Sequence, residues 1–270
     1  YTMVYGIAKM LNFAHGDVIM IGVYSAFVAL YRANLPLPIA LIISIIICTL
    51  LGVIIERLAY KPLRQASSLA VLITAIGVSY FLQNLALLIW GSAAKIFPTI
   101  LDYGSINLFN DQLKLSYQML ITITVCIVIM ILLNLFIKKT KIGKAMRACS
   151  EDKEAAALMG INVDNIISLT FAIGSGLAAI AAILLCAAYP TVTPTLGSMP
   201  GIKAFTAAVI GGIGSIPGAL LGGLLLGVIE IIVKAYGLSE LTDAIAFGVL
   251  ILVLLFKPTG LLGKKVKEKV

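Results

Sequence analysis

The sequence predicts an all-α fold, a polytopic transmembrane helical bundle in which about eight spans are visible. Hydrophobic residues make up 61% of the 270 residues, charged residues only 12%, and the mean hydropathy is +1.09. A soluble domain is nearer half apolar and a quarter charged. The apolar runs are continuous, whereas a transmembrane β-strand alternates over roughly ten residues. These observations exclude a soluble enzyme, a disordered chain and a disulfide-framed secreted module.

Charged residues and turn signals set the bounds of the spans, since about 20 apolar residues cross a bilayer. Arg32 and Glu56 enclose the second span, and the Pro-rich stretch 190–200 follows the fifth. Residues 211–217, which read GGIGSIP, separate the sixth span from the seventh. In chain order, the predicted spans are residues 18–31, 33–55, 67–90, 115–137, 166–189, 203–216, 218–235 and 244–262.

Basic residues cluster in three places, which hold 14 of the 20 lysines and arginines. If all eight segments cross, the clusters share one side, and the positive-inside rule makes that side, with the C-terminus, cytoplasmic. A re-entrant sixth segment would put the basic tail on the opposite side, so we count this segment as a crossing. The net charge of +8 therefore reflects topology and does not indicate nucleic acid. The clusters are Arg57, Lys61 and Arg64; Lys138, Lys139, Lys141, Lys144, Arg147 and Lys153; and Lys257, Lys264, Lys265, Lys267 and Lys269.

Residues that carry catalysis or bind metals are sparse. The single histidine, His15, has too few partners to build a metal site. The four cysteines share no CxxC spacing, so we expect them to be buried small side chains without a disulfide or a metal. No GxxxxGK[ST] phosphate loop is present, so the chain does not hydrolyse ATP by itself. An enzyme is therefore not indicated, and no cofactor is expected on this chain.

Polar residues inside the spans are costly and often functional. Glu230 and Lys234 are four residues apart in the seventh span and are predicted to form an ion pair near the outer interface. Gln83 and Asn84 lie in the third span. These two amides are predicted either to form interhelical hydrogen bonds or to line a pathway.

Glycines point to a helix start and to close helix packing. Residues 12–17 combine hydrogen-bonding side chains with a glycine, Gly16, at the predicted start of a helix. Its exposed N–H groups either meet a carboxylate or simply lie at the membrane surface. Gly218 and Gly222, like Gly223 and Gly227, are four residues apart, a spacing that lets helix backbones approach closely in lipid.

Residues 138–165 form the longest predicted cytoplasmic loop of an otherwise undivided transmembrane domain, residues 1–270. Ser150, with Glu154 behind it, is typical of a helix N-cap followed by an acid in the first turn. Alanines continue the helix, and Gly160 can end it. The sequence therefore predicts one short amphipathic helix with a small face and charged ends, which suits docking to a soluble partner.

Several segments together resemble a known family. Residues 154–160, EAAALMG, are similar to the E-A-A-x-x-x-G coupling motif of ABC importer permeases. The chain resembles branched-chain amino acid permeases of the LivH type more closely still, because residues 5–6 and 11–17 match their Y-G…N-F-A-H-G start. The other matching segments are 147–152 with 160–162, 203–218 and 256–263. These segments extend over nearly the whole chain.

The resemblance implies a permease subunit of an ATP-driven importer for leucine, isoleucine and valine in a bacterial or archaeal cytoplasmic membrane. It implies a second permease subunit, two cytoplasmic ATPase subunits that bind ATP and Mg²⁺, and an extracytoplasmic amino-acid-binding protein. It also implies that one transmembrane span precedes Tyr1. Lys9 departs from the family pattern, because a small or apolar residue is expected there.

Two sets of residues would carry this function. The first couples the permease to an ATPase: Arg147, Glu151, Asp152, Glu154, Ala155, Ala156 and Gly160. The second lines the substrate path: Asn12, Phe13, His15, Gly16, Thr206, Gly211 and Gly212.

Two alternative functions stay open at this point. An ABC permease for another small solute, such as urea, short amides or other amino acids, has a sequence pattern that differs little. A secondary transporter or channel that works without ATP usually carries intramembrane acids for ion coupling, for which Glu230 alone is thin support. The resemblance of residues 154–160 to a coupling motif argues against a third function, that of a purely structural membrane scaffold.

Overall fold

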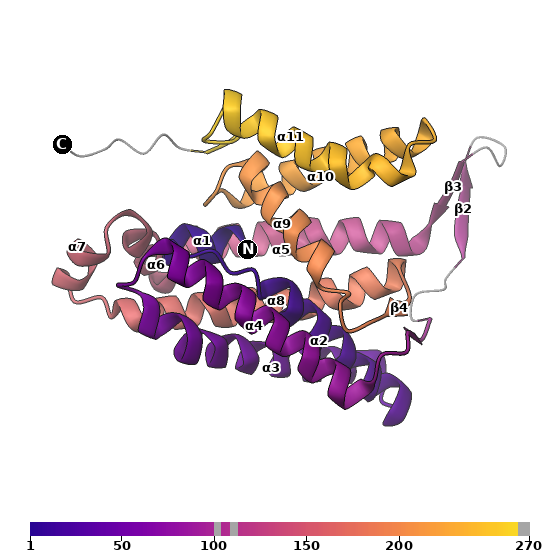
Figure 1. Cartoon of the computed structure of the whole chain (residues 1–270), viewed down its shortest axis with the longest axis horizontal. Helices are drawn as coiled ribbons and strands as arrows, with labels where there is room; N and C mark the ends of the chain where they lie inside the picture. The colour runs from indigo at the N-terminus through magenta and orange to yellow at the C-terminus, as the bar shows by residue number, and fades with distance from the viewer. Residues whose placement is uncertain (100–103, 109–112, 264–270) are drawn as a thin grey trace.

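The computed structural model describes residues 1–99, 104–108 and 113–263 and shows a bundle of helices with two small β-sheets at one end (Figure 1). Each of the eight predicted spans overlaps a helix, but the sixth, 203–216, begins five residues after the first residue of α9 and extends past its end, and the eighth, 244–262, extends beyond the last residue of α11, Phe256. The helices are α1 (Thr2–Ala8), α2 (His15–Phe27), α3 (Leu37–Ile55), α4 (Ser68–Trp90), α5 (Tyr117–Lys139), α6 (Lys141–Glu151), α7 (Lys153–Leu158), α8 (Val163–Ala188), α9 (Ser198–Gly211), α10 (Ile216–Ala235) and α11 (Thr242–Phe256).

Short turns of other helix types extend several of these elements. A π-helical turn, Val28–Arg32, continues α2, and a second one, Glu56–Tyr60, continues α3. A 3₁₀ turn, Lys61–Leu63, follows the second π turn, and another, Ser239–Leu241, precedes α11. With these extensions, six helical segments among the described residues are long and apolar enough to cross a membrane.

The helices α2 and α9 are shorter than a full crossing. They have 13 and 14 residues. At 1.5 Å per residue, a helix of this length spans about 20 Å, less than the roughly 30 Å of a hydrocarbon core. Because the π turn Val28–Arg32 continues α2, that helical segment runs over residues 15–32, about 27 Å, and only α9 covers clearly less than the bilayer thickness.

Two antiparallel sheets lie at one end of the bundle, which we call the hairpin end (Figure 1). In the first, β1 (Lys95–Ile96) pairs with β4 (Thr191–Val192). In the second, β2 (Ser105–Leu108) pairs with β3 (Leu113–Ser116). The fourth span accordingly begins two residues later than predicted, at Tyr117, because the residues before it belong to β3. Strands of two to four residues are too short to show an alternating pattern, and the sequence analysis missed them.

The prediction of one helix in residues 138–165 is wrong. There are two helices, α6 and α7, at the end opposite the sheets, which we call the basic end (Figure 1). Asp152 has extended backbone angles and separates them, and its carboxylate caps α7 by accepting from the Ala155 N–H (2.9 Å). Ser150 is not a cap, because it lies within α6 and its hydroxyl donates to the Arg147 carbonyl (2.7 Å). Gly160 follows α7 with a φ of 82°, as expected of a helix-ending glycine.

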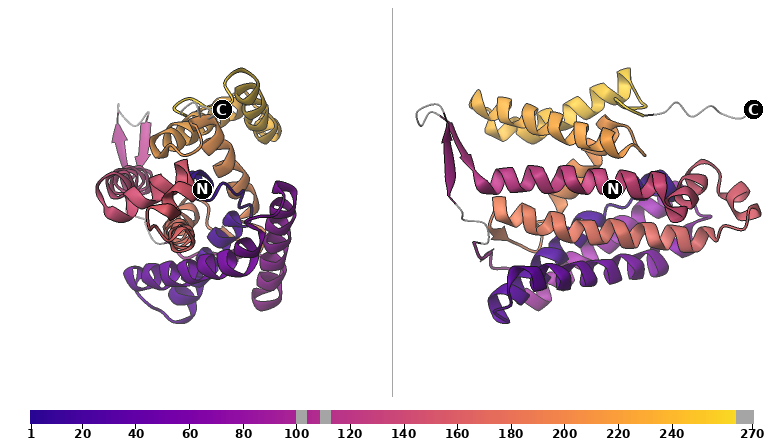
Figure 2. Two further views of the ribbon diagram at one scale, coloured as in Figure 1. Left: turned by 90° about the vertical axis from the view of Figure 1, so that its left-hand side faces the viewer. Right: turned by 180° about the vertical axis from the view of Figure 1, so that it is seen from behind.

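The core of the bundle lies around α2. Every residue of α2 is buried, and the helix contacts α3, α4, α8 and α9. Figure 2 shows α10 and α11 at one edge of the bundle and α3 and α4 at the opposite edge. No residue of α5 is buried, so its apolar side chains face lipid or a partner subunit. The short helix α2 is therefore enclosed by longer ones.

Close packing of α9 on α10 depends on glycine. A Cβ at Gly218 would meet the Gly211 carbonyl, and a Cβ at Gly222 would meet the Ala207 carbonyl. The predicted packing role of these two glycines is confirmed. Gly223 and Gly227 do not pack closely against another described helix of this chain, because a Cβ at Gly227 would meet nothing within 4 Å and one at Gly223 would meet only a side-chain methyl at 4.0 Å.

Candidate functional site

The helices α6 and α7 project from the basic end, and most of the predicted coupling residues lie on them (Figure 1). Glu154, Ala155 and Gly160 are exposed. Ala156 is only 4% exposed and packs inward in a cluster with Met146. The small face predicted for docking is therefore divided, since only one of its two alanines is accessible to a partner.

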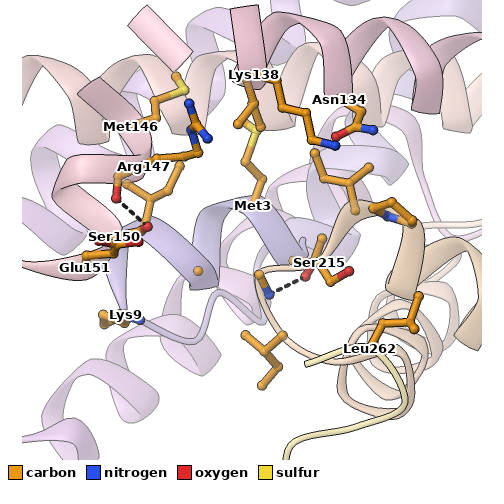
Figure 3. A pocket seen from close by; sticks show the side chains of 18 residues that line it. Met3, Lys9, Asn134, Lys138, Met146, Arg147, Ser150, Glu151, Ser215 and Leu262 are labelled. Atoms are coloured by element: carbon orange, nitrogen blue, oxygen red, sulfur yellow. Dashed lines mark hydrogen bonds between the residues drawn. The ribbon is translucent and has the colours of Figure 1, made fainter. Parts of the chain in front are cut away.

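A cavity of about 440 Å³ lies beside α6, at the basic end (Figure 3). Arg147 and Glu151 of the predicted coupling set line it, together with Met3 of α1 and Lys138 of α5. The turn between α9 and α10 closes another side, where Ser215 is placed. The cavity therefore joins the coupling helices to α1 and to the Gly-rich turn that the sequence singled out. A second hollow of about 360 Å³ is lined by Lys9 and residues 149–154.

The short helix α1 connects α7 to the turn between α9 and α10. At one end, the Lys153 ammonium donates to the Ala8 carbonyl (2.8 Å), which is free because α1 ends there. Lys9 caps α1 in a left-handed conformation with a φ of 59°. At the other end, the Thr2 hydroxyl accepts from the Gly214 N–H (2.8 Å). These two hydrogen bonds therefore connect α7, through α1, to the wall of the cavity.

Four residues of the predicted substrate path come together at the start of α2. The Asn12 side chain accepts from the Tyr60 hydroxyl (2.9 Å), and the rings of His15 and Tyr1 meet edge to face at 5.8 Å. Phe13 packs on Phe205 of α9, with 5.8 Å between ring centroids. The fourth residue, Gly16, lies directly against Gly197 and Gly201 at the start of α9, so backbone atoms of α9 cover this face of the α2 N-terminus.

The other three predicted path residues are not part of this group. The Thr206 hydroxyl donates to the Ile202 carbonyl of its own helix (3.0 Å). Gly211 packs on Gly218, and Gly212, with a φ of 104°, lies against Gly263. These contacts give the two glycines a role in helix packing and in the turn after α9.

The polar residues within the spans differ partly from the predictions. Gln83 does form the predicted interhelical bonds, but the Asn84 amide donates to the Tyr80 carbonyl of its own helix (2.8 Å). The predicted pair of Glu230 with Lys234 is wrong. Glu230 faces α9 and pairs there with Lys203 (2.9 Å), which also pairs with Asp243 of α11 (2.8 Å). This three-residue group ties α9, α10 and α11 together.

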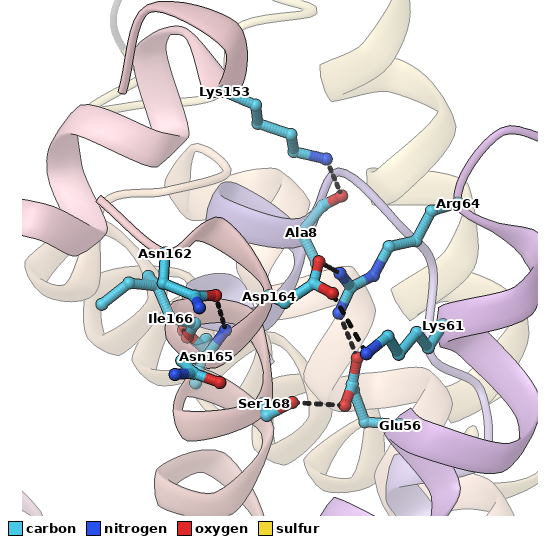
Figure 4. A network of polar contacts seen from close by, with 11 residues as sticks. Ala8, Glu56, Lys61, Arg64, Lys153, Asn162, Asp164, Asn165, Ile166 and Ser168 are labelled. Carbon is cyan, nitrogen blue, oxygen red and sulfur yellow. Dashed lines mark hydrogen bonds and ion pairs between the residues drawn. The ribbon is translucent and has the colours of Figure 1, made fainter. Parts of the chain in front are cut away.

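An ionic network holds the connection between α3 and α4 against α8 at the basic end (Figure 4). The fully buried Glu56 carboxylate pairs with Arg64 and accepts from the Ser168 hydroxyl (2.5 Å). Arg64 also pairs with Asp164, and Lys61 reaches the same carboxylate at 3.1 Å. Asp164 is in the first turn of α8, which follows α7 in the chain. The network therefore holds in place the helix start to which α7 is connected.

Comparison with known proteins identifies the family. Residues 1–254 match the family model described as the permease component of branched-chain amino acid transport systems. The chain belongs to this family. It is 49% identical to the high-affinity branched-chain amino acid transport system permease protein BraD of Pseudomonas aeruginosa and 44% identical to LivH of Escherichia coli K12. Each alignment covers all of this chain and 91% of the relative. The probable LivH permease of Methanocaldococcus jannaschii is 28% identical over 99% of this chain and 88% of that protein. No solved structure matches significantly.

Family membership and the six long apolar helices make the chain a multi-pass integral membrane protein. The relatives are transport subunits rather than enzymes, and each is one component of a transport system. The network at the basic end and α7 are therefore parts of a permease.

Removing the buried charge at the centre of the network is expected to destabilise the permease. We expect Glu56→Gln to cost about 3 kcal/mol, because it leaves the Arg64 guanidinium without a buried partner. The control is Asp164→Asn, whose carboxylate is half exposed, with an expected cost below about 1 kcal/mol. Thermal unfolding of the purified permease in detergent compares the two. Equal midpoints for both variants would contradict the role assigned to Glu56.

Two features of α7 and its surroundings were not predicted from the sequence. Leu158, the last residue of α7, and Met159, which follows it, are 89% and 83% exposed, so two large apolar side chains face outward outside the spans. Both residues are large and apolar and lie in the predicted cytoplasmic loop 138–165, which is a signal that the sequence contains. The contact of Lys153 with Ala8 joins residues 145 positions apart, and no local pattern predicts it.

Proposed function

We propose that the chain is the permease subunit of an ATP-driven ABC importer for leucine, isoleucine and valine. The observation that carries the proposal is full-length similarity, at 44–49% identity, to proteins named high-affinity branched-chain amino acid permeases. The substrate is a zwitterion with an apolar side chain. A weakly polar path suits such a solute when a separate binding protein supplies the affinity.

The assembly proposed around the chain has four kinds of partner. A second permease subunit completes the path, and two ATPase subunits, which hold ATP and Mg²⁺, lie below it. An extracytoplasmic binding protein delivers the amino acid. Support comes from family membership and from two basic clusters, residues 57–64 and 138–153, which lie at one end of the described bundle, whereas Lys264, Lys265, Lys267 and Lys269 lie outside the described residues. By the positive-inside rule, that basic end and the C-terminus are cytoplasmic, in a bacterial or archaeal cytoplasmic membrane.

In this proposal α7 is the helix that docks on an ATPase. Its exposed Glu154, the exposed Leu158 and Met159, and the open space around Gly160 support this role. An ATPase biases the permease only through contacts that differ between its two states. Lys153 and α1 then connect the docking helix to the cavity. We assign the substrate path to the group at the start of α2, Asn12, Phe13, His15 and Gly16.

Uptake by a reconstituted complex tests the proposed function. Proteoliposomes that contain the permease, its partner permease, both ATPases and the binding protein are supplied with labelled leucine, with and without ATP. The proposal expects ATP-dependent uptake that isoleucine and valine compete. If the binding protein stimulates ATP hydrolysis but leucine is not taken up, the chain is still an ABC permease, and its substrate is another small solute.

A bulky residue on the docking helix is expected to uncouple ATP hydrolysis from uptake. We expect Glu154→Trp and Gly160→Trp to lower uptake at least tenfold while insertion into the membrane is unchanged, because the indole occupies the docking surface. Gly237→Trp is the matched control, since Gly237 also has a positive φ (78°) and open space around it, but lies in the turn after α10. Uptake at the wild-type rate in both Glu154→Trp and Gly160→Trp would contradict the docking role of α7.

A further inference from the structure

A buried carboxylate lies where α2, α4 and α9 meet. Asp17, in the first turn of α2, is only 1% exposed. Its Oδ1 atom accepts from the Gln83 amide of α4 at 2.9 Å. The same Gln83 nitrogen donates to the hydroxyls of Ser198 at the start of α9 and Ser79 of α4, each at 3.1 Å. Four polar side chains from three helices thus form one cluster, the Asp17 cluster.

The Asp17 cluster lies at membrane depth. Gln83 is 15 residues after the first residue of α4, Ser68, and 7 residues before the last, Trp90. At 1.5 Å per residue, the cluster is about 22 Å from one end of the span and about 10 Å from the other. An ionisable side chain at such depth is costly and marks a functional site by default.

Within the described residues, Asp17 has no cationic partner. The ion pairs found there use the carboxylates of Glu56, Asp164, Glu230 and Asp243. Asp17 has hydrogen bonds from neutral groups only, and these offset a charge less well than a cation does. A carboxylate held in this way is suited to receive a positive charge from outside the chain.

The cluster reaches the surface of the bundle on the α4 side. Gln83, Ser79 and Ser198 are each partly exposed, and the amide of Asn84 and the ring of Tyr80 are exposed beside them. Polar groups do not face hydrocarbon readily, so the polar atoms of Gln83, Ser79 and Ser198 favour contact with protein or water, although apolar side chains such as Ile76 and Leu87 are exposed one turn away on α4. A water-filled path between two permease subunits meets that requirement.

We propose that the Asp17 cluster receives the ammonium group of the transported amino acid. This inference rests on the proposed function, because it requires a zwitterionic substrate. An ammonium group has three donors. Asp17 and the two serine hydroxyls already converge on one nitrogen donor, the Gln83 amide, so the ammonium group would take the place of this neutral amide. The apolar side chain of the substrate needs no polar partner, so a single ionic contact orients the molecule in the path.

The first test compares uptake with ATP hydrolysis in the complete reconstituted complex. We expect Asp17→Asn to lower leucine uptake at least tenfold, while ATP hydrolysis stimulated by the binding protein stays within twofold of wild type. Asp243→Asn is the control, a carboxylate on α11 outside the cluster. Wild-type uptake by Asp17→Asn would overturn the inference. Failure of the wild-type complex to take up leucine would overturn the proposed function instead.

The second test uses the original aspartate and does not depend on uptake. In a background in which Cys126→Ser removes the exposed cysteine, Ser198→Cys is treated with methanethiosulfonate reagents that carry an ammonium or a sulfonate group. We expect the cationic reagent to react at least tenfold faster, and Asp17→Asn to abolish the preference. Equal reaction rates for the two reagents, or no reaction with either, would show that the cluster is a buried packing contact without access to water, and would overturn the inference.

Discussion

Replacing Gly16 with leucine is expected to lower uptake about a hundredfold and to reduce the amount of assembled complex. A Cβ at this position would fall on the carbonyl oxygen of Gly197 and lie 3.0 Å from the Gly201 Cα atom. Both obstacles are backbone, so α2 and α9 must separate to accept even one methyl group. Overpacking a dense core costs about 1–3 kcal/mol, and here it also moves the start of the helix that carries the proposed path.

The matched control for Gly16→Leu is Gly77→Leu on α4. A Cβ at Gly77 meets nothing within 4 Å, and the position is exposed, so we expect uptake close to wild type. Co-purification of the partner subunits measures assembly, and leucine uptake measures function. If Gly16→Leu assembles and transports like Gly77→Leu, the close contact between α2 and α9 does not exist in the working permease.

The segments that span the membrane were predictable because charge and apolar length mark them directly. The bounds of α4, 68–90, differ by one residue from those predicted, and the break at 211–217 falls where α9 gives way to α10. What the pattern does not show is depth. The charge-free stretch that contains α2 looks like a short span, yet α2 is a buried helix of 13 residues enclosed by longer ones.

Helix in the segment 138–165 was predictable, but its division into α6 and α7 was not. The E-A-A-x-x-x-G pattern and the ending of α7 before Gly160 follow from local chemistry. Ser150 and Asp152 are both good N-caps, and sequence alone does not choose between them. The choice is made by α6, which continues through Ser150 because Met146 and Cys149 bury its inner face in a cluster with Ala156.

The partners of charged residues in the spans were the least predictable part. Glu230 is as close in sequence to Lys234 as an ion pair on one helix requires, yet it pairs with Lys203 of α9. The reason is burial, because Glu230 faces the neighbouring helix. The Asp17 cluster has the same origin, since Gln83 is 66 positions away from Asp17 and the packing of α2 on α4 brings them together.

Removing the ammonium group of Lys153 is expected to lower uptake at least tenfold while stimulated ATP hydrolysis stays near wild type. Lys153→Met keeps the apolar stem but loses the hydrogen bond to the Ala8 carbonyl. Burial lowers the pKa of Lys153, and the nearby charges of Arg64 and Lys9 lower it further. The ammonium is thus partly withdrawn from water, and the contact with Ala8 replaces some of the lost hydration. Without that contact, the ATPase moves α7 but α1 does not follow.

The control for this experiment is Lys144→Met, which removes an exposed positive charge from α6, the neighbouring helix. Because Lys144 does not touch α1 among the hydrogen bonds and ion pairs of the described residues, we expect uptake close to wild type. If both variants lose uptake, the cause is the lower positive charge at the basic end and not the contact with α1. A loss in Lys153→Met alone assigns it to α1, whose other end holds the Gly214 N–H at the wall of the cavity. Normal uptake in Lys153→Met would show that movement passes from the ATPase to the path by another route.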